Sequence, residues 1–176
     1  MPKDKYKPKV LFLCTGNSCR SQMAEGWARH LWPDAIAAYS AGVKPTKLNA
    51  DAVRVMAEVG IDISRQCSKH IDDLRDVAFD YVVAVCDGAY ESCPVFPGCA
   101  NVVRHSFDDP PQLTETITDE NDRLAVYRRV RDEIRAFVYK LPATFNGTRQ
   151  VASEHRKDSH DESNSARMAK HSAVIS

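Results

Sequence analysis

The sequence lacks an excess of charge of either sign. Its 24 Lys and Arg residues match its 24 Asp and Glu residues, so the formal net charge is zero. Proteins that hold DNA, RNA or an anionic membrane by electrostatic attraction carry a basic surplus or a basic stripe. We therefore expect neither nucleic acid nor a membrane surface among the partners of this protein.

A long apolar run is also missing. No stretch reaches the roughly 18 apolar residues that a membrane-spanning helix needs. The basic residues 1–9 are followed by a short strand-like run without a small-residue cleavage site, so we expect no secretory signal. The 176 residues, 43% of them hydrophobic, are enough for one core but short for two domains. We expect a cytoplasmic monomer.

Six cysteines are present, yet no Cys-x-x-Cys pair occurs and no histidine stands at zinc-finger spacing from them. The pattern of a structural zinc site is therefore missing, and we expect no bound metal or cofactor. Without a secretory signal, a disulfide framework is not expected either. We interpret the cysteines as reactive thiols in a reducing compartment.

Short apolar runs alternate with helical patterns over the first 140 residues. This alternation predicts right-handed βαβ units, and hence an α/β fold with a parallel sheet covered on both sides. The predicted strands are 9–13, 35–40, 81–85 and a short one at 102–103. The predicted helices are 21–31, 49–59, 68–74 and a final one of about twenty residues that ends near 141.

The end of the chain has a different composition. Residues 147–176 contain no aromatic residue, few aliphatic ones and half of the six histidines. Such a composition is typical of disorder, and the irregular spacing of the histidines favours a solvated tail over a metal site. We therefore expect one domain over residues 1–146 and a disordered tail over 147–176.

A small polar loop follows the first predicted strand. Cys14 stands at the carboxyl end of this strand, where ligands sit in parallel sheets. The loop can point several N–H groups at one spot beside a helix N-terminus, and Arg20 adds a planar fork that suits a tetrahedral oxyanion. The same donors stabilise a thiolate, so we expect Cys14 to be ionised near neutral pH. The predicted oxyanion-binding residues are Thr15, Gly16, Asn17, Ser18, Cys19, Arg20 and Ser21.

The spacing Cys-x5-Arg alone also fits a buried cysteine followed by a surface arginine. The wider pattern is more specific, because CTGNSCRS followed by QMAEGW resembles the phosphate-binding loop and first helix of the low-molecular-weight tyrosine phosphatases and the related thioredoxin-coupled arsenate reductases. The resemblance extends from about Val10 to about Leu141. It implies a three-layer α/β sandwich with a four-stranded parallel sheet, and it makes Cys14 the nucleophile.

Two carboxyl groups precede a proline at 107–110 and could protonate a departing oxygen. From the residues alone, an ordinary loop turn is an equally good interpretation. The resemblance implies that the acid is the aspartate directly before the proline, which is Asp109 and not Asp108.

Cys86 follows the strand 81–85, so it stands at the same edge of the sheet as Cys14. Cys93 lies seven residues further on, a span of roughly 23 Å when extended, so a disulfide to Cys86 would require the segment to fold back. From the residues alone, a buried Cys86 and an incidental Cys93 are equally plausible. The resemblance implies a relay through all three cysteines, in which arsenate is reduced to arsenite and thioredoxin removes the final disulfide.

The resemblance also bears on a cation. Some reductases of this family hold potassium near the loop with residues that correspond to Asn17, Glu25, Ser40 and an aspartate, and the position of the aspartate is Lys69 here. The Lys69 ammonium would take the place of the cation next to Glu25. We therefore predict weak or absent potassium activation.

Other functions remain as alternatives. A low-molecular-weight tyrosine phosphatase usually has an aromatic residue where this chain has Pro111, and residues 15–17 offer no large ring to stack on phosphotyrosine. A thiol-based arsenite or metal sensor would use the later cysteines but has no need of Cys14, Arg20 or Asp109. An arsenate reductase could also take its electrons from glutathione and glutaredoxin. The arsenate reductase is the prediction, with residual phosphatase activity.

Overall fold

The computed structural model describes residues 6–88 and 101–168, and for residues 146–168 it describes the backbone only. Cys93 and Cys99 therefore lie outside the described residues. The chain divides into two units, Met1–Tyr139 and Lys140–Ser176. The first unit contains the sheet and the predicted site.

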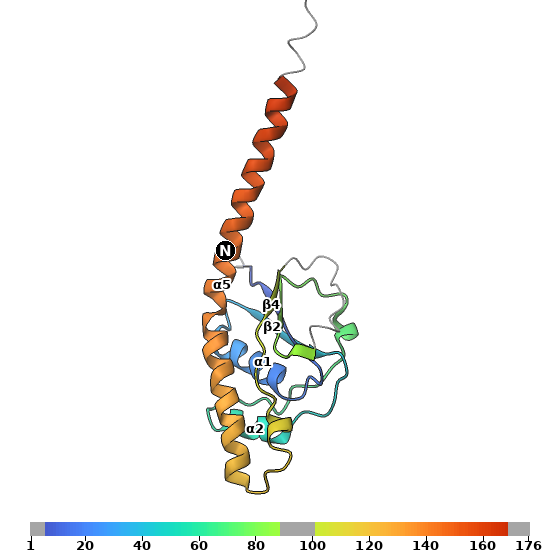
Figure 1. Cartoon of the computed structure of the whole chain (residues 1–176), viewed down its shortest axis with the longest axis vertical. Helices are drawn as coiled ribbons and strands as arrows, with labels where there is room; N and C mark the ends of the chain where they lie inside the picture. The colour runs from blue at the N-terminus through green and yellow to red at the C-terminus, as the bar shows by residue number, and fades with distance from the viewer. Residues whose placement is uncertain (1–5, 89–100, 169–176) are drawn as a thin grey trace, which may run out of the picture. The chain divides into compact units, whose positions relative to one another are not determined.

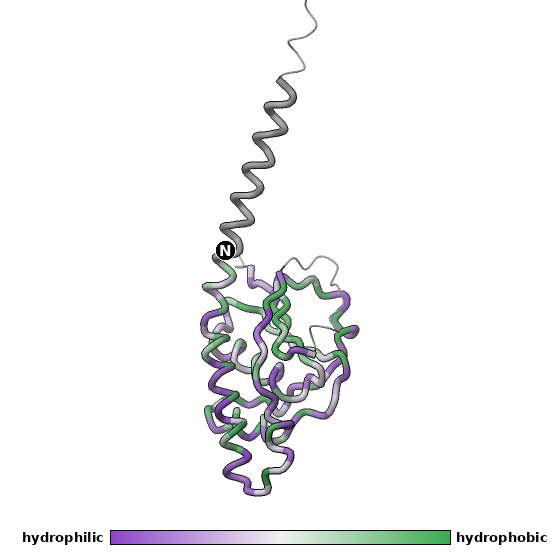
Figure 2. The backbone as a smooth tube through the Cα atoms, in the orientation of Figure 1, coloured by the Kyte–Doolittle hydropathy of each residue, from purple (hydrophilic) through white to green (hydrophobic). Residues whose placement is uncertain are grey.

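Four parallel strands form the sheet of the first unit (Figure 1). Strand β1 lies between β2 and β3, and β4 pairs with β3. Residues 10–13 of β1 have no exposed surface, and Figure 2 shows the apolar segments that run through this unit. The predicted α/β fold with a four-stranded parallel sheet is confirmed. The strands are β1 (Lys9–Cys14), β2 (Ala37–Gly42), β3 (Tyr81–Ala84) and β4 (Asn101–Arg104).

The helices differ from the prediction in three places. The pattern at 68–74 forms only a 3-10 turn, at whose start the His70 ring accepts from the Asp72 N–H and the Asp73 carboxylate accepts from the His70 N–H. A short helix begins at Pro110, which suits the first helical position since proline has no N–H to leave unpaired. The last helix is much longer than twenty residues. The helices are α1 (Arg20–Leu31), α2 (Ala50–Ala57), η1 (Ile71–Leu74), α4 (Pro110–Leu113) and α5 (Glu120–Met168).

Helix α1 is enclosed by its neighbours. It packs on β1 and β2, and Trp27 donates a hydrogen bond from Nε1 to the Arg131 carbonyl of α5 at 3.2 Å. A Cβ on Gly26 would lie 2.7 Å from a methyl group of Ile63. Residues 21–28 are all buried as a result, so the helix that follows the predicted oxyanion loop is held on several sides.

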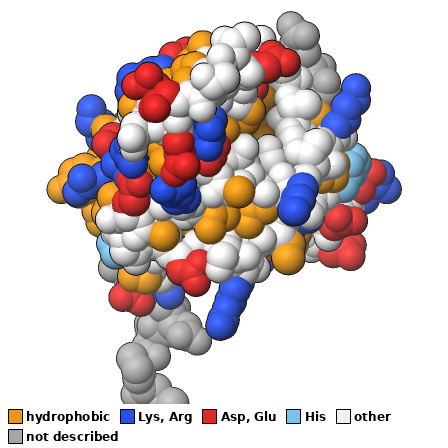
Figure 3. Space-filling model, turned by 90° about the horizontal axis from the view of Figure 1, so that it is seen from below, with side chains coloured by type: hydrophobic (Ala, Val, Ile, Leu, Met, Phe, Trp, Pro, Cys, Tyr) orange, Lys and Arg blue, Asp and Glu red, His pale blue; other side chains and the backbone are white. Residues whose placement is uncertain are grey.

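Helix α2 begins as predicted, with Asn49 as the N-cap that accepts a hydrogen bond from the Ala52 N–H at 2.9 Å. Ion pairs join α2 and its C-terminal end to the first turns of α5, among them Arg128 with Glu58 and Arg123 with Asp51. On the face shown in Figure 3, acidic and basic side chains accordingly lie next to one another. Positive and negative side chains in this region therefore neutralise one another in ion pairs.

Helix α5 spans both units. Up to Tyr139, its buried residues recur at helical spacing, which confirms the predicted apolar face. In the second unit, the backbone is helical to Met168, whereas the composition predicts a disordered tail from residue 147. That disorder stays a prediction. Among the described residues, no helix is both long and apolar enough to cross a membrane.

Candidate active site

The predicted nucleophile lies where three strands end. Cys14 is the last residue of β1 and stands beside Gly42, the last residue of β2. On the other side, the Val85 N–H donates to the Leu13 carbonyl at 2.9 Å, so Cys86 comes directly after the end of the β1–β3 pairing. Both thiols are buried. The sheet thus brings Cys14 and Cys86 to one edge, as the sequence predicts.

The loop after β1 is held from one side by the segment after β2. Four backbone N–H groups of residues 43–49 donate to carbonyls of the loop 14–18 over 2.8–3.4 Å. Because the C=O and N–H of a trans peptide point in opposite directions, carbonyls tied to one side turn the loop's N–H groups to the other. The Asn17 N–H shows this directly, since it reaches the Cys14 sulfur at 3.1 Å.

Gly42 permits this close approach of the two segments. A Cβ at this position would lie 2.6 Å from the Thr15 carbonyl oxygen and 2.8 Å from the Asn17 nitrogen, distances that only a backbone shift could relieve. Along the chain, Gly42 is distinguished only by its place just after the predicted strand 35–40. A glycine that closes a strand beside a proposed ligand loop is the signal that could have identified it.

Asn17 has the unusual backbone conformation that the loop requires. Its φ of 45° makes it the one non-glycine residue with a positive φ in the described part of the chain. Asparagine tolerates this region better than most residues. Its side chain is fully buried and donates from Nδ2 to the Ser21 hydroxyl at 2.9 Å. Asn17 therefore shapes the loop and also orients Ser21.

The Ser21 hydroxyl lies where it can donate its proton to the nucleophile. Its oxygen lies 2.9 Å from the Cys14 sulfur, and because it already accepts a hydrogen bond from Asn17, its own hydrogen is free to be donated to that sulfur. Burial raises the pKa of Cys14, the Ser21 hydrogen bond lowers it, nearby Cys86 raises it, and the Asn17 N–H lowers it. The net direction is upward, opposite to the thiolate expected at neutral pH, because loss of hydration outweighs these donors in the free site.

Arg20 joins the loop to the predicted acid. As the first residue of α1, it donates from Nη1 to the Phe107 carbonyl at 3.0 Å, and its Nη2 lies 3.3 Å from Oδ1 of Asp109. Asp108 instead pairs with Arg129 of α5 at 2.9 Å. Of the two carboxylates, Asp109 is thus the one beside the arginine of the loop, which supports the choice of Asp109 as the acid.

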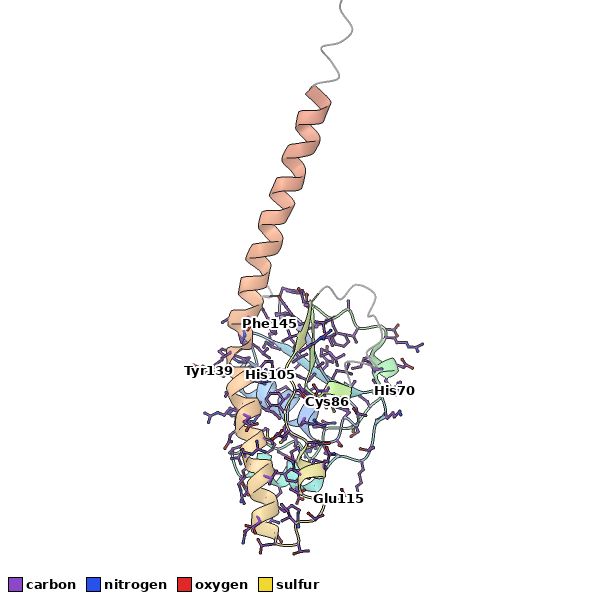
Figure 4. All side chains as sticks on the ribbon, in the orientation of Figure 1. His70, Cys86, His105, Glu115, Tyr139 and Phe145 are labelled. Atoms are coloured by element: carbon purple, nitrogen blue, oxygen red, sulfur yellow. The ribbon has the colours of Figure 1, made fainter. Side chains whose placement is uncertain are left out.

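A pocket of about 530 Å³ opens in front of these groups. Cys86 lines it, and its sulfur lies 3.5 Å from the Thr15 hydroxyl. Figure 4 labels Cys86 within the fold, among the elements that form this edge. Cys14 is 3% exposed and does not line the pocket, so it lies behind the lining groups. The lining residues are Thr15, Arg20, Cys86, Asp87, Gly88, Ser106, Phe107, Asp108, Asp109 and Gln112.

The remaining cysteines have different environments. Cys19 is buried, and burial raises the pKa of its thiol, so a role for Cys19 in the loop is confined to its backbone. Cys67 is exposed. The site geometry involves neither thiol.

The residues predicted at the cation position form a hydrogen-bonded cluster. The Lys69 ammonium donates to the Ser40 carbonyl at 3.0 Å, and the Lys69 backbone N–H donates to Oδ1 of Asn17 at 2.9 Å. The Ser40 hydroxyl donates to Glu25. Among the described residues, however, Glu25 pairs with Arg29 and not with Lys69. The Lys69 ammonium therefore contacts the Ser40 carbonyl, and not the Glu25 carboxylate that the sequence predicts as its neighbour.

Metal-ligating side chains do not gather in the described part of the chain, where no group of three or more His, Cys, Asp or Glu residues could hold an ion. The loop instead offers backbone N–H groups, such as that of Asn17 at the Cys14 sulfur, and Arg20 adds a guanidinium. These donors suit an anion, and the Cys86 sulfur lies 3.5 Å from the Thr15 hydroxyl at the same edge of the sheet. The arrangement can bind an oxyanion and attack it with sulfur.

Comparison with known proteins agrees with a site that binds an oxyanion. The sequence model of the family described as low molecular weight phosphotyrosine protein phosphatase matches residues 9–151. An arsenate reductase of Shouchella clausii is 46% identical over 140 residues, which cover 78% of this chain and 97% of that protein. An arsenate reductase of Bacillus subtilis is 48% identical over 126 residues, 71% of this chain and 88% of that protein.

A solved structure has the same fold. It is described as an arsenate reductase in the phosphate binding state and is 33% identical to this chain. The TM-score is 0.62, and the match covers 78% of this chain and 98% of the other.

Proposed function

The chain belongs to the low molecular weight phosphotyrosine protein phosphatase family, and we propose that within this family it is an arsenate reductase that works through Cys14, Cys86 and Cys93. The observation that carries the proposal is the second thiol. Cys86 lines the same pocket as Arg20 and Asp109, at the sheet edge that also holds Cys14. Phosphate hydrolysis has no need of this thiol, whereas reduction does. Similarity to arsenate reductases supports the same choice.

The first step forms a bond between sulfur and arsenic. Arsenate binds to the loop N–H groups and Arg20, and the Cys14 thiolate attacks the arsenic. One arsenic–oxygen bond breaks, and the departing oxygen leaves as water with a proton from Asp109. Ser21 stabilises the thiolate before attack through the hydrogen bond described above.

The second step reduces the arsenic. The Cys86 thiolate attacks the Cys14 sulfur, so a disulfide forms, the sulfur–arsenic bond breaks and its electron pair stays on arsenic, which leaves as arsenite. Cys93 then attacks the Cys86 sulfur. This exchange releases the Cys14 thiolate and leaves a Cys86–Cys93 disulfide. Cys93 lies outside the described residues, so its part rests on the resemblance to the reductases.

The disulfide must be reduced by an external dithiol. We propose thioredoxin, which serves the reductases that this sequence resembles, with NADPH as the ultimate source of the two electrons and no cofactor bound to the chain itself. A cytoplasmic location agrees with this need, because the cycle starts from three reduced thiols. We also propose that the protein acts as a monomer.

Phosphatase activity is the second candidate function. The loop, Arg20 and Asp109 would act on phosphate as they do on arsenate, since the two oxyanions have the same shape and charge. Among the described residues that line the pocket, however, the one aromatic residue is Phe107, whose side chain is buried. We therefore propose phosphate-ester hydrolysis as a residual activity.

The test is arsenate-dependent oxidation of NADPH in the presence of thioredoxin and thioredoxin reductase, compared between the wild type and Cys93→Ser. We expect steady turnover in the wild type. In Cys93→Ser we expect at most a single turnover, because the Cys14–Cys86 disulfide has no partner to resolve it.

Two controls separate the alternatives. Cys67→Ser should keep full turnover, since that exposed thiol does not take part. If the wild type shows no turnover with thioredoxin but does with glutathione and glutaredoxin, the proposed reductant is wrong and the proposed reaction is right. If neither system supports turnover while an aryl phosphate is hydrolysed, the protein is a phosphatase and the proposed function is wrong.

A further inference from the structure

Each carbonyl of the oxyanion loop, residues 14–18, accepts a hydrogen bond, but the donors are of two kinds. Those of residues 14, 15, 16 and 18 accept hydrogen bonds from backbone N–H groups of the segment 43–49. The carbonyl of Asn17 is the exception. It accepts from two side chains, the Ser68 hydroxyl at 2.5 Å and the Gln22 amide at 2.9 Å.

This difference matters because each carbonyl shares a peptide plane with the next N–H. The Asn17 carbonyl and the Ser18 N–H belong to one trans peptide and point in opposite directions. The neighbouring peptide shows the effect, since the Gly16 carbonyl is held at 2.8 Å by the Thr46 N–H and the Asn17 N–H faces the Cys14 sulfur on the other side. Holding the Asn17 carbonyl therefore sets the direction of the Ser18 N–H.

We propose that Ser68 is a positioning residue of the oxyanion site, and that it acts by fixing the peptide between Asn17 and Ser18 so that the Ser18 N–H faces the bound oxyanion. The chemistry it serves is recognition of a tetrahedral oxyanion, phosphate or arsenate. That arsenate is the physiological substrate rests on the proposed function, but the role of Ser68 does not.

The residues around Ser68 support this role. Gln66 donates from its amide to the carbonyl and to Oε1 of Gln22, and so orients the other side chain on the Asn17 carbonyl. The Lys69 N–H donates to Oδ1 of Asn17 at 2.9 Å. Residues 66–69, here called the strap, thus hold Asn17 at three points, directly or through Gln22.

Within the strap, Ser68 is the member that substitution can test most cleanly. The contact from Lys69 comes from the backbone, which no side-chain change removes, and Gln66 acts only through Gln22. Asn17 has a positive φ of 45°, a conformation that persists when its surroundings over-determine it. Removal of one of the two donors on its carbonyl should let this peptide rotate away from the geometry that binds the oxyanion.

The experiment measures binding of inorganic phosphate to the full-length protein by isothermal titration calorimetry, at a temperature well below unfolding. We expect Ser68→Ala to weaken phosphate binding about fivefold, as the loss of one neutral hydrogen bond predicts. Ser68→Thr, which keeps the hydroxyl, should restore the wild-type affinity. In steady-state assays with arsenate, Ser68→Ala should raise KM by a similar factor and lower kcat less.

Ser64→Ala is the matched control, because Ser64 lies in the same segment, is exposed and, among the described residues, has its hydrogen bonds with Asp62. It should bind phosphate like the wild type. The proposal is overturned if Ser68→Ala binds phosphate with unchanged affinity, or if Ser68→Thr is as impaired as Ser68→Ala. A wild type that binds phosphate but does not reduce arsenate would reject the proposed function and leave this measurement valid.

Discussion

At the scale of single residues, the site depends on a short chain of donors that ends at one sulfur atom. Asn17 donates to Ser21, and Ser21 donates to Cys14. The first link has a fixed direction because an amide N–H donates, and once Cys14 is ionised its sulfur can only accept from Ser21. The chain acts against burial, which raises the pKa of the Cys14 thiol. The reactivity of the nucleophile should therefore respond to Ser21 and to pH.

We expect the rate at which iodoacetamide alkylates Cys14 to rise with pH through neutrality and into the alkaline range. The reason is that the raised pKa of Cys14 leaves most of the thiol protonated at neutral pH. Ser21→Ala removes a hydrogen bond that favours the thiolate, so it should shift the profile to higher pH and slow alkylation at neutral pH roughly tenfold. Mass spectrometry of the Cys14 peptide measures the rate separately from the other cysteines.

Alkylation of exposed Cys67 in the same samples is the internal control and should not change with Ser21→Ala. A Cys14 profile that is identical in wild type and variant would show that the Ser21 contact does not influence ionisation.

Lys69 leads to a second prediction at this scale. Its ammonium donates to the Ser40 carbonyl, one of the positions assigned to the cation site from the resemblance. A fixed positive charge repels a second cation at short range. We therefore expect kcat/KM for arsenate to stay the same when potassium chloride replaces sodium chloride at equal ionic strength. A several-fold rise with potassium would show that a cation binds despite Lys69.

At the scale of elements, the loop takes its shape from two segments that are far from it in sequence. Residues 43–49 hold its carbonyls from one side, and the strap holds Asn17. The first contact depends on β1 and β2 lying side by side with Cys14 opposite Gly42. Strand pairing, and not the loop's own sequence, thus decides where the loop's N–H groups face.

Gly42→Ala tests this dependence. The added Cβ would meet backbone atoms of Thr15 and Asn17 at 2.6 and 2.8 Å, so the loop and the segment after β2 must move apart. We expect kcat/KM to fall about 100-fold, the scale of a misplaced binding group, and the free energy of unfolding to fall by about 2 kcal/mol. Activity assays and urea unfolding measure the two effects.

Gly60→Ala is the matched glycine variant. Nothing lies within 4 Å of its added Cβ, but its φ of +78° makes any side chain strained there. It should lose about 1 kcal/mol of stability and keep its activity. If both variants lose activity in proportion to their stability, the special role of Gly42 in the loop is refuted.

At the scale of the whole molecule, one unit contains the described site and the other follows it along α5. The Shouchella clausii reductase is matched over 97% of its length by only 140 residues of this chain. The family model likewise matches residues 9–151, so we expect the fold and the chemistry not to depend on the last part of the sequence. An isolated helix of polar composition also has only marginal stability in water.

We therefore expect a protein that ends at residue 146 to keep the arsenate turnover and the melting temperature of the full chain. Far-UV circular dichroism adds a test of the tail itself. If residues 147–176 are disordered in solution, as their composition predicts, their removal should leave the helical signal per molecule unchanged. A clear loss of signal would show that α5 is helical to Met168 in solution, and a loss of turnover would give the tail a role in function.

The sequence by itself determined the fold class, the position of Cys14 at a strand end and the order of the elements, because these depend on local patterns. A buried run such as residues 10–13 and a helical repeat are visible in neighbouring residues. The choice of Asp109 and the relay of three cysteines came from resemblance, since isolated aspartates and thiols have ordinary structural explanations. Local patterns failed at 68–74, where the chain forms a 3-10 turn over Ile71–Leu74 and not a longer helix.

The tertiary structure alone decided which distant groups meet the loop. Gly42, Gln22 and Ser68 show no pattern along the chain that marks them as site residues, because their roles depend on strand pairing and on contacts across many sequence positions. It also decided the direction in which the pKa of Cys14 is shifted. The donors that favour a thiolate could be read from the loop, but the burial that opposes them exists only once the sheet and helices enclose the sulfur.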